Sequence, residues 1–114
     1  MQNDSCDFVI VTEFLEHYFD TIHILKEIKR ILRVGGQVIF TVPSIWPMHE
    51  APHDYHRFTK FSLSDYFSKV GFSKWEIKPL GGFNYSVALT LALWNDYKLD
   101  KQKKVDATYH QICN

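Results

Sequence analysis

Over the first 42 residues, two short apolar runs flank one stretch in which apolar positions recur at helical spacing. The run Phe8–Val11 is apolar throughout and mostly β-branched, which is typical of a strand buried on both faces of a parallel sheet. Residues 20–33 place apolar side chains at helical spacing, and Gly35–Gly36 is expected to end this amphipathic helix. A second apolar run, Val38–Val42, completes a strand–helix–strand order. We therefore predict two parallel strands joined by a right-handed crossover.

The patterns after residue 59 are weaker. Ser62 is expected to cap a short helix that ends at Gly71. Residues 72–78 alternate between apolar and polar side chains, which predicts a half-exposed strand near a sheet edge. Residues 83–99 are apolar on nearly all sides, which favours a helix that is buried against a large surface.

A long loop, Pro43–Thr59, follows the second predicted strand. Its three prolines exclude a regular helix or strand, and it holds three of the six histidines. Because parallel strands place their carboxyl ends at one edge of a sheet, this loop and the loop at residues 12–19 are expected to face the same crevice. A loop this rich in titratable side chains is usually functional, although a stiff surface loop with incidental histidines is the alternative.

Composition narrows the class of protein. The chain has 114 residues, and its 13 basic side chains balance 13 acidic ones, so we expect neither a nucleic-acid partner nor a charged membrane surface as partner. No apolar run reaches the roughly 18 residues of a membrane span. Two cysteines, Cys6 and Cys113, form no disulfide framework and no zinc motif. This usage predicts a reducing compartment, the cytoplasm.

Several segments, in this order, resemble one enzyme family. The segment Asp7–His17, with its Glu-x-Leu-Glu-His run, is similar to the fourth strand and following loop of class I S-adenosylmethionine-dependent methyltransferases of the small-molecule "type 11" group. Residues 25–36 resemble the next helix and turn of that family, with Val34 where a proline is usual. Residues 46–59 look like a loop found in one subset. The resemblance covers about residues 5–83.

The resemblance implies an α/β fold, a partial Rossmann-like methyltransferase fold whose N-terminal cofactor-binding half is missing. None of the five glycines forms a G-x-G-x-x-G loop after a strand. We therefore expect a truncated methyltransferase-like domain over residues 1–99 and a polar tail over residues 100–114. Its cofactor would be S-adenosylmethionine in the complete domain, and this chain alone is expected not to bind it or to be active.

The resemblance also assigns site residues. The backbone that borders the cofactor is that of Val11, Thr12 and Glu13. The candidate catalytic residues are His17, His53 and Asp54. The candidate substrate-binding residues are Trp46, His49, Glu50, Tyr55 and Arg57. The expected substrate is a small-molecule methyl acceptor.

An imidazole suits the role of base in methyl transfer, because its charge changes near neutral pH. His17 and His53 are the candidates, with Asp54 or Glu50 orienting one of them. A structural role for His17 is an equal alternative. For Arg57, a salt bridge to Asp54 or Glu50 is favoured over a substrate clamp.

Two other functions stay open at this stage. The chain is either a methyltransferase fragment or a non-catalytic interaction module with the same fold. A metal site built from His49, His53 and His56 with Glu50 or Asp54 is disfavoured, because no zinc motif is present. The first strand is expected to have an unpaired edge, which predicts a homodimer or pairing through that edge.

Overall fold

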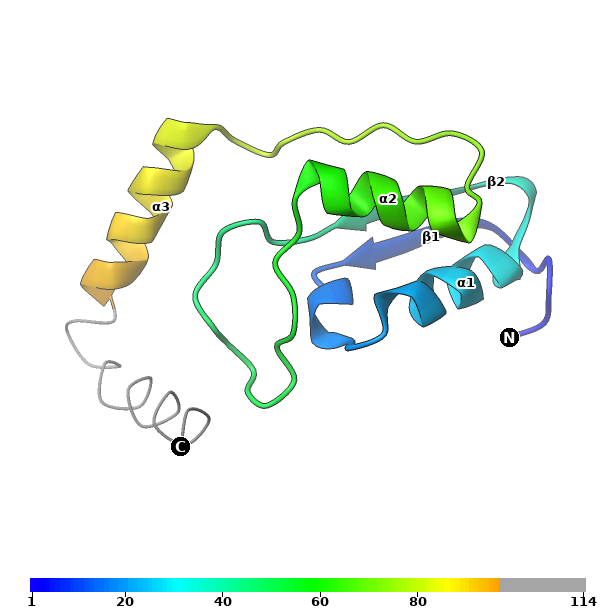
Figure 1. Ribbon diagram of the computed structural model, residues 1–114, viewed down its shortest axis with the longest axis horizontal. Coiled ribbons are helices and arrows are strands. Elements are labelled where there is room, and N and C mark those ends of the chain that lie inside the picture. Colours follow the sequence, from blue (N-terminus) through cyan, green and yellow to red (C-terminus); the bar gives the residue numbers. More distant parts are fainter. Residues whose placement is uncertain (97–114) are drawn as a thin grey trace. The chain divides into compact units, whose positions relative to one another are not determined.

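The computed structural model describes residues 1–96, which fall into two compact units. The first unit joins residues 1–45 to residues 53–77, and the second joins residues 46–52 to the segment that begins at residue 78. The predicted tail at residues 100–114 lies outside the described residues. The helices and strands of the first unit are β1 (Cys6–Thr12), η1 (Leu15–His17), α1 (Thr21–Ile31), β2 (Leu32–Thr41) and α2 (Lys60–Val70) (Figure 1).

The two strands of the first unit are parallel, which confirms the predicted strand–helix–strand unit. Val9 lies opposite Val38, and Val11 lies opposite Phe40. Side chains at paired positions of a sheet share a face. These four side chains therefore point toward the same side of the sheet.

Both long helices of the first unit pack on that side. Leu25 and Ile28 of α1 meet Leu63 and Phe67 of α2 in one apolar core. The ring of Phe67 also stacks on Phe40 of β2, with ring centroids 5.4 Å apart. The buried apolar residues of this core are Val11, Leu15, Leu25, Ile28, Leu32, Phe58, Leu63, Phe67 and Val70.

The opposite face of the sheet is open, so the prediction that both strands are buried on both faces is wrong for residues 1–96. Phe8, Ile10 and Ile39 are 47%, 65% and 52% exposed. Ile10 and Ile39 lie side by side in the register. The physical reason is that α1 and α2 cover one face only, so alternate residues of each strand are left without a covering layer.

The crossover helix is shorter than predicted. α1 ends at Ile31, its C-cap Leu32 is already extended, and β2 continues through Gly35–Gly36, so these glycines do not end the helix. The N-terminal lead-in explains the early end, because the backbone N–H groups of Asp4 and Ser5 donate to the carbonyls of Arg30 and Ile31. Asp20 caps the other end of α1, and its side chain accepts from the N–H of His23.

The later elements also differ in part. Thr59, and not Ser62, is the N-cap of α2, although both join in a capping box. Gly71 ends the helix in the left-handed conformation, as predicted. Residues 72–78 form no strand, because the sheet described over residues 1–96 contains β1 and β2 alone.

The second unit contains α3 (Phe83–Asp96), which confirms a helix in this region. None of its residues is buried, so the expected burial against a large surface is not seen. No helix within residues 1–96 has the length and apolar character needed to cross a membrane.

One lysine ties the two helices of the first unit together. The Nζ atom of Lys29 in α1 donates to the carbonyl oxygens of Val70 and Gly71, at 3.0 and 2.6 Å. These carbonyls lie at the C-terminal end of α2, where backbone acceptors lack intrahelical partners and a cation is favoured. The side chain therefore caps α2 from its neighbour.

Replacing this cap is expected to destabilise the first unit. Lys29→Met keeps most of the aliphatic length and removes the charged donor, so it should lower the free energy of unfolding by about 1 kcal/mol. Urea denaturation followed by circular dichroism measures this. Lys26→Met, at an exposed position of the same helix, is the matched control; equal losses from both variants would contradict the capping role.

Candidate active site

The carboxyl ends of β1 and β2 lie next to one another. The N–H of Glu13, the residue after β1, donates to the carbonyl of Thr41, the last residue of β2, at 3.0 Å. Glu13 has a φ of 44°, in the left-handed region that non-glycine residues rarely adopt. Val11 is buried, whereas Thr12 and Glu13 are exposed. The three predicted cofactor-binding residues thus occupy the end of β1, and their cofactor role stays a prediction.

The loops that leave the two strands are hydrogen-bonded to each other. The carbonyl of Glu16 in η1 accepts from the N–H groups of Tyr55 and His56, at 2.8 and 3.3 Å. The ring nitrogen Nε2 of His56 donates in turn to the carbonyl of Phe19, at 3.1 Å. The predicted convergence of the two loops is therefore confirmed for the part of the second loop that belongs to the first unit.

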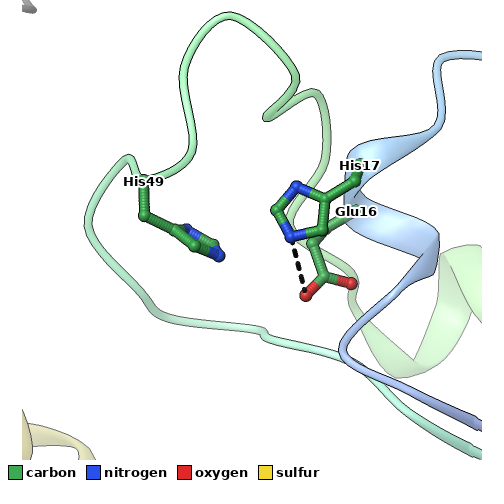
Figure 2. Close-up of side chains that lie close together, drawn as sticks. All are labelled: Glu16, His17 and His49. Atoms are coloured by element: carbon green, nitrogen blue, oxygen red, sulfur yellow. Dashed lines mark ion pairs between the residues drawn. The ribbon is translucent and has the colours of Figure 1, made fainter.

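Glu16 and His17 extend from η1, and Figure 2 shows their facing side chains. The Nε2 atom of His17 lies 3.8 Å from Oε1 of Glu16. The Glu16 side chain is fully buried, and that of His17 is 17% exposed. The other ring nitrogen of His17, Nδ1, is 2.6 Å from the carbonyl oxygen of His53. A buried carboxylate beside an imidazole is an arrangement that can hold and transfer a proton.

Glu16 is the site residue that the sequence interpretation did not assign. A charged residue is almost never fully buried unless it is paired, so nothing in the composition marks it. The available signal was its position directly before a candidate base, on the short segment after a buried strand. Only its burial separates it from Glu13, which is exposed three residues earlier.

The second predicted base, His53, is placed differently. Its backbone carbonyl faces His17, whereas its ring is exposed and its Nδ1 lies 3.2 Å from the hydroxyl of Tyr55. The ring of Tyr55 meets that of Phe19 edge to face, with centroids 5.8 Å apart. His53 thus supports the His17 ring through its main chain, and a catalytic role for its own imidazole stays a prediction.

Arg57 forms the salt bridge to Asp54 that was favoured from the sequence. Its two terminal nitrogens, Nη1 and Nη2, bind the two carboxylate oxygens of Asp54 at 2.6 and 2.8 Å. The Asp54 side chain is only 3% exposed, and Nη1 also donates to the carbonyl of His56. This bidentate pair fixes the turn between the two residues. Catalysis by Asp54 and substrate binding by Arg57 stay predictions.

The remaining predicted substrate-binding residues, apart from Tyr55, belong to the second unit. Within it, the rings of Trp46 and His49 meet edge to face, with centroids 6.5 Å apart. Glu50 has a φ of 51° and is exposed. Their contact with a substrate stays a prediction.

Removing the arginine of the buried pair is expected to destabilise the loop. Arg57→Met would leave the Asp54 carboxylate without its bidentate partner, at a cost of about 3 kcal/mol in the free energy of unfolding. The double variant Asp54→Asn, Arg57→Met should recover part of the loss, because no buried charge is then left behind. Thermal and urea denaturation of the three proteins measure the difference, and a single variant as stable as the parent would contradict the pairing.

Comparison with known proteins gives one match. Residues 1–40 match the family model described as "Methyltransferase domain". The matched segment contains β1, η1, α1 and all but the last residue of β2. No curated protein and no solved structure matches the chain.

Proposed function

We propose that this chain forms part of an S-adenosylmethionine-dependent methyltransferase domain that acts on a small-molecule acceptor. The observation that carries the proposal is the methyltransferase-domain match over residues 1–40. The parallel strands and the hydrogen-bonded loops at their carboxyl ends support it, because ligands of open α/β sheets bind at that edge.

The residues of the chain fit part of a cofactor site. Val11, Thr12 and Glu13 at the end of β1 would border S-adenosylmethionine, which supplies an activated methyl group when bound. The chain contributes no glycine-rich loop after a strand. We therefore infer that residues outside this sequence hold the rest of the cofactor. The 114-residue chain alone is expected neither to bind S-adenosylmethionine nor to catalyse methyl transfer.

In the proposed methyl transfer, the chain positions the acceptor and supplies the base that removes its proton. η1 and the segment at residues 53–57 present His17 at the carboxyl edge of the sheet, beside the end of β1. Removal of a proton from the acceptor by a placed imidazole contributes a factor of about 10² to 10⁴ in rate. Desolvation and orientation of the two reactants supply much of the remainder.

Calorimetry tests the cofactor proposal. Titration of the 114-residue chain with S-adenosylmethionine is expected to show no binding. A fusion that adds the first three strands and the glycine-rich loop of a type 11 methyltransferase domain is expected to bind at micromolar concentration. Micromolar binding by the chain alone would contradict the inferred incompleteness, and a folded fusion that binds nothing would contradict the assignment of function.

Activity of the same fusion tests the base. His17→Asn should lower kcat toward an accepted substrate by about 100-fold. His23→Asn is the matched control, because His23 is exposed on α1. A fall of equal size in both variants, or in neither, would contradict a role for His17 in the chemistry.

The open face of the sheet favours the alternative function, a methyltransferase-like interaction module without catalysis. Exposed Phe8, Ile10 and Ile39 form an apolar surface on ordered backbone, and such surfaces mark interaction sites. The calorimetric result separates the two functions, because an interaction module would gain no cofactor binding from the added half.

We also propose that two copies of the chain pair through the edge of β1 that does not face β2. Strand edges are usually protected by proline, lysine or a covering segment, and β1 contains neither residue. The chain has a formal net charge of zero, so two copies do not repel each other strongly. Pairing would extend the sheet and its apolar face across both copies.

Light scattering after size exclusion measures this assembly. The parent chain is expected to be a dimer at micromolar concentration, and Ile10→Lys is expected to be a monomer because it places a charge on the shared apolar face. Phe61→Lys is the control, since Phe61 is 82% exposed and belongs to α2 and not to the sheet. A monomeric parent would contradict the proposal.

A further inference from the structure

Helix α3 exposes a stripe of large apolar side chains along one face. Residues that follow one another at intervals of four, four and three lie on the same side of a helix. The four members of this α3 stripe, each at least 42% exposed, are Phe83, Val87, Leu91 and Trp94. Leu89 and Leu93, on another side of the helix, are half-buried. The stripe is therefore the most open side of α3.

A helix with this composition is unfavourable in water. Residues 79–95 contain no charged side chain and no histidine. A helix without a charged face is normally buried against protein or lipid, and 14 residues are marginal for a helix that stands alone in water. No residue of α3 is buried. We therefore expect a further surface to cover the stripe.

The charges on either side of this segment indicate which kind of surface that is. Lys78 precedes it, and the sequence at residues 97–104 contains four lysines and one aspartate. Lysine is depleted at protein interfaces, whereas lysine clusters beside an apolar helix attract anionic lipid headgroups. The zero net charge of the whole chain, on which the expectation of no membrane partner depends, averages out this local excess. The charge pattern therefore favours lipid over protein as the cover.

The aromatic residues and the length of α3 fit the surface of a bilayer. Tyr85 lies in the first turn of the helix and Trp94 in the last. Such amphipathic rings favour the headgroup level of a membrane. At about 1.5 Å per residue the helix is about 21 Å long, which is shorter than the roughly 30 Å of a bilayer's hydrocarbon core. A helix of this length lies in the interface.

We propose that α3 binds the surface of an anionic membrane. The α3 stripe enters the boundary between headgroups and acyl chains, and the lysines on either side contact the anionic headgroups. This binding does not depend on methyl transfer or on pairing of two copies through β1, because α3 belongs to the second unit of the chain.

Co-sedimentation of the 114-residue chain with vesicles tests the proposal. We expect binding to vesicles made of equal parts of phosphatidylcholine and phosphatidylserine. Binding to pure phosphatidylcholine should be about 10-fold weaker, because the lysines then meet no anionic headgroup. Added salt should weaken the binding by screening the charges. A chain that does not bind the anionic vesicles, or binds both kinds equally, would overturn the proposal.

A polar substitution in the stripe tests the role of α3. Leu91→Gln should weaken binding to the anionic vesicles about 10-fold, because less apolar surface enters the lipid. The helix should persist, since Leu91 is exposed and glutamine is a good helix former. Phe61→Gln is the matched control, because Phe61 is an exposed apolar residue of α2. Equal losses in two variants with native circular dichroism spectra would overturn the assignment to α3.

The lysines are tested by neutral replacements. The double variant Lys103→Gln, Lys104→Gln should bind anionic vesicles roughly 20-fold more weakly, since each lysine near the surface contributes about fivefold. The double variant Lys26→Gln, Lys60→Gln is the control, because it changes the net charge equally at exposed positions of the first unit. If both double variants lost the same affinity, the net charge of the chain and not the flanking lysines would be responsible.

Fluorescence locates the contact on the chain. Lipids with brominated acyl chains quench a tryptophan that enters the bilayer, and the chain has three tryptophans. Trp94→Phe should keep most of the binding and lose most of the quenching. Trp75→Phe, in the first unit, should lose little. The reverse result would overturn the placement of α3 in the lipid.

Light scattering without lipid examines the other kind of cover. Leu91→Gln is expected to leave the mass of the parent assembly unchanged. A lower mass would show that the stripe covers a protein surface, and the membrane proposal would then be wrong.

Discussion

The backbone hydrogen bonds between β1 and β2 are the constraint on which the candidate site depends. They hold two segments that are far apart in the sequence in parallel register, with Thr12 opposite Thr41. Both strands therefore end at the same edge of the sheet. The loops that follow them lie close enough to hydrogen-bond directly to each other. The contact from Glu13 to Thr41 continues the connection beyond the strands. If the pairing were shifted by one residue, the core-facing side chains of one strand would point to the open face.

Burial of Glu16 is the second feature that gives the site its character. A carboxylate removed from water costs several kcal/mol unless neighbours compensate the charge. A protein gains little stability from such a residue, since an apolar side chain would fill the space at lower cost. Its position beside His17, on a three-residue helix held by two backbone hydrogen bonds from the opposite loop, therefore favours a functional interpretation.

The open face of the sheet shows what the first unit lacks. α1 and α2 share one apolar core on a single face, and the cap from Lys29 to the end of α2 keeps these helices together. On the other face, Phe8 and Ile10 of that unit are 47% and 65% exposed. An exposed apolar sheet face marks a surface that takes a partner, and the interaction-module alternative and the pairing of two copies both depend on it.

The sequence by itself determined the order and direction of the first two strands and of the helix between them. Apolar runs at Phe8–Val11 and Val38–Val42 on either side of an amphipathic helix are enough to predict parallel strands, and parallel strands are enough to predict that the following loops converge. Local chemistry also identified Gly71 as a helix end, because a helix end of this kind depends on neighbouring residues only.

Only the tertiary structure decided which faces are buried and which polar groups meet. Ile10 and Val11 look alike in the sequence, yet one is exposed and the other is in the core, because that depends on where both helices pack. The glycines after α1 became part of a strand because the N-terminal segment pairs with the end of that helix. Only the folded loops bring Asp54 to Arg57 and Glu16 to His17. No spacing rule in the sequence distinguishes an exposed carboxylate from one that folding places beside an imidazole.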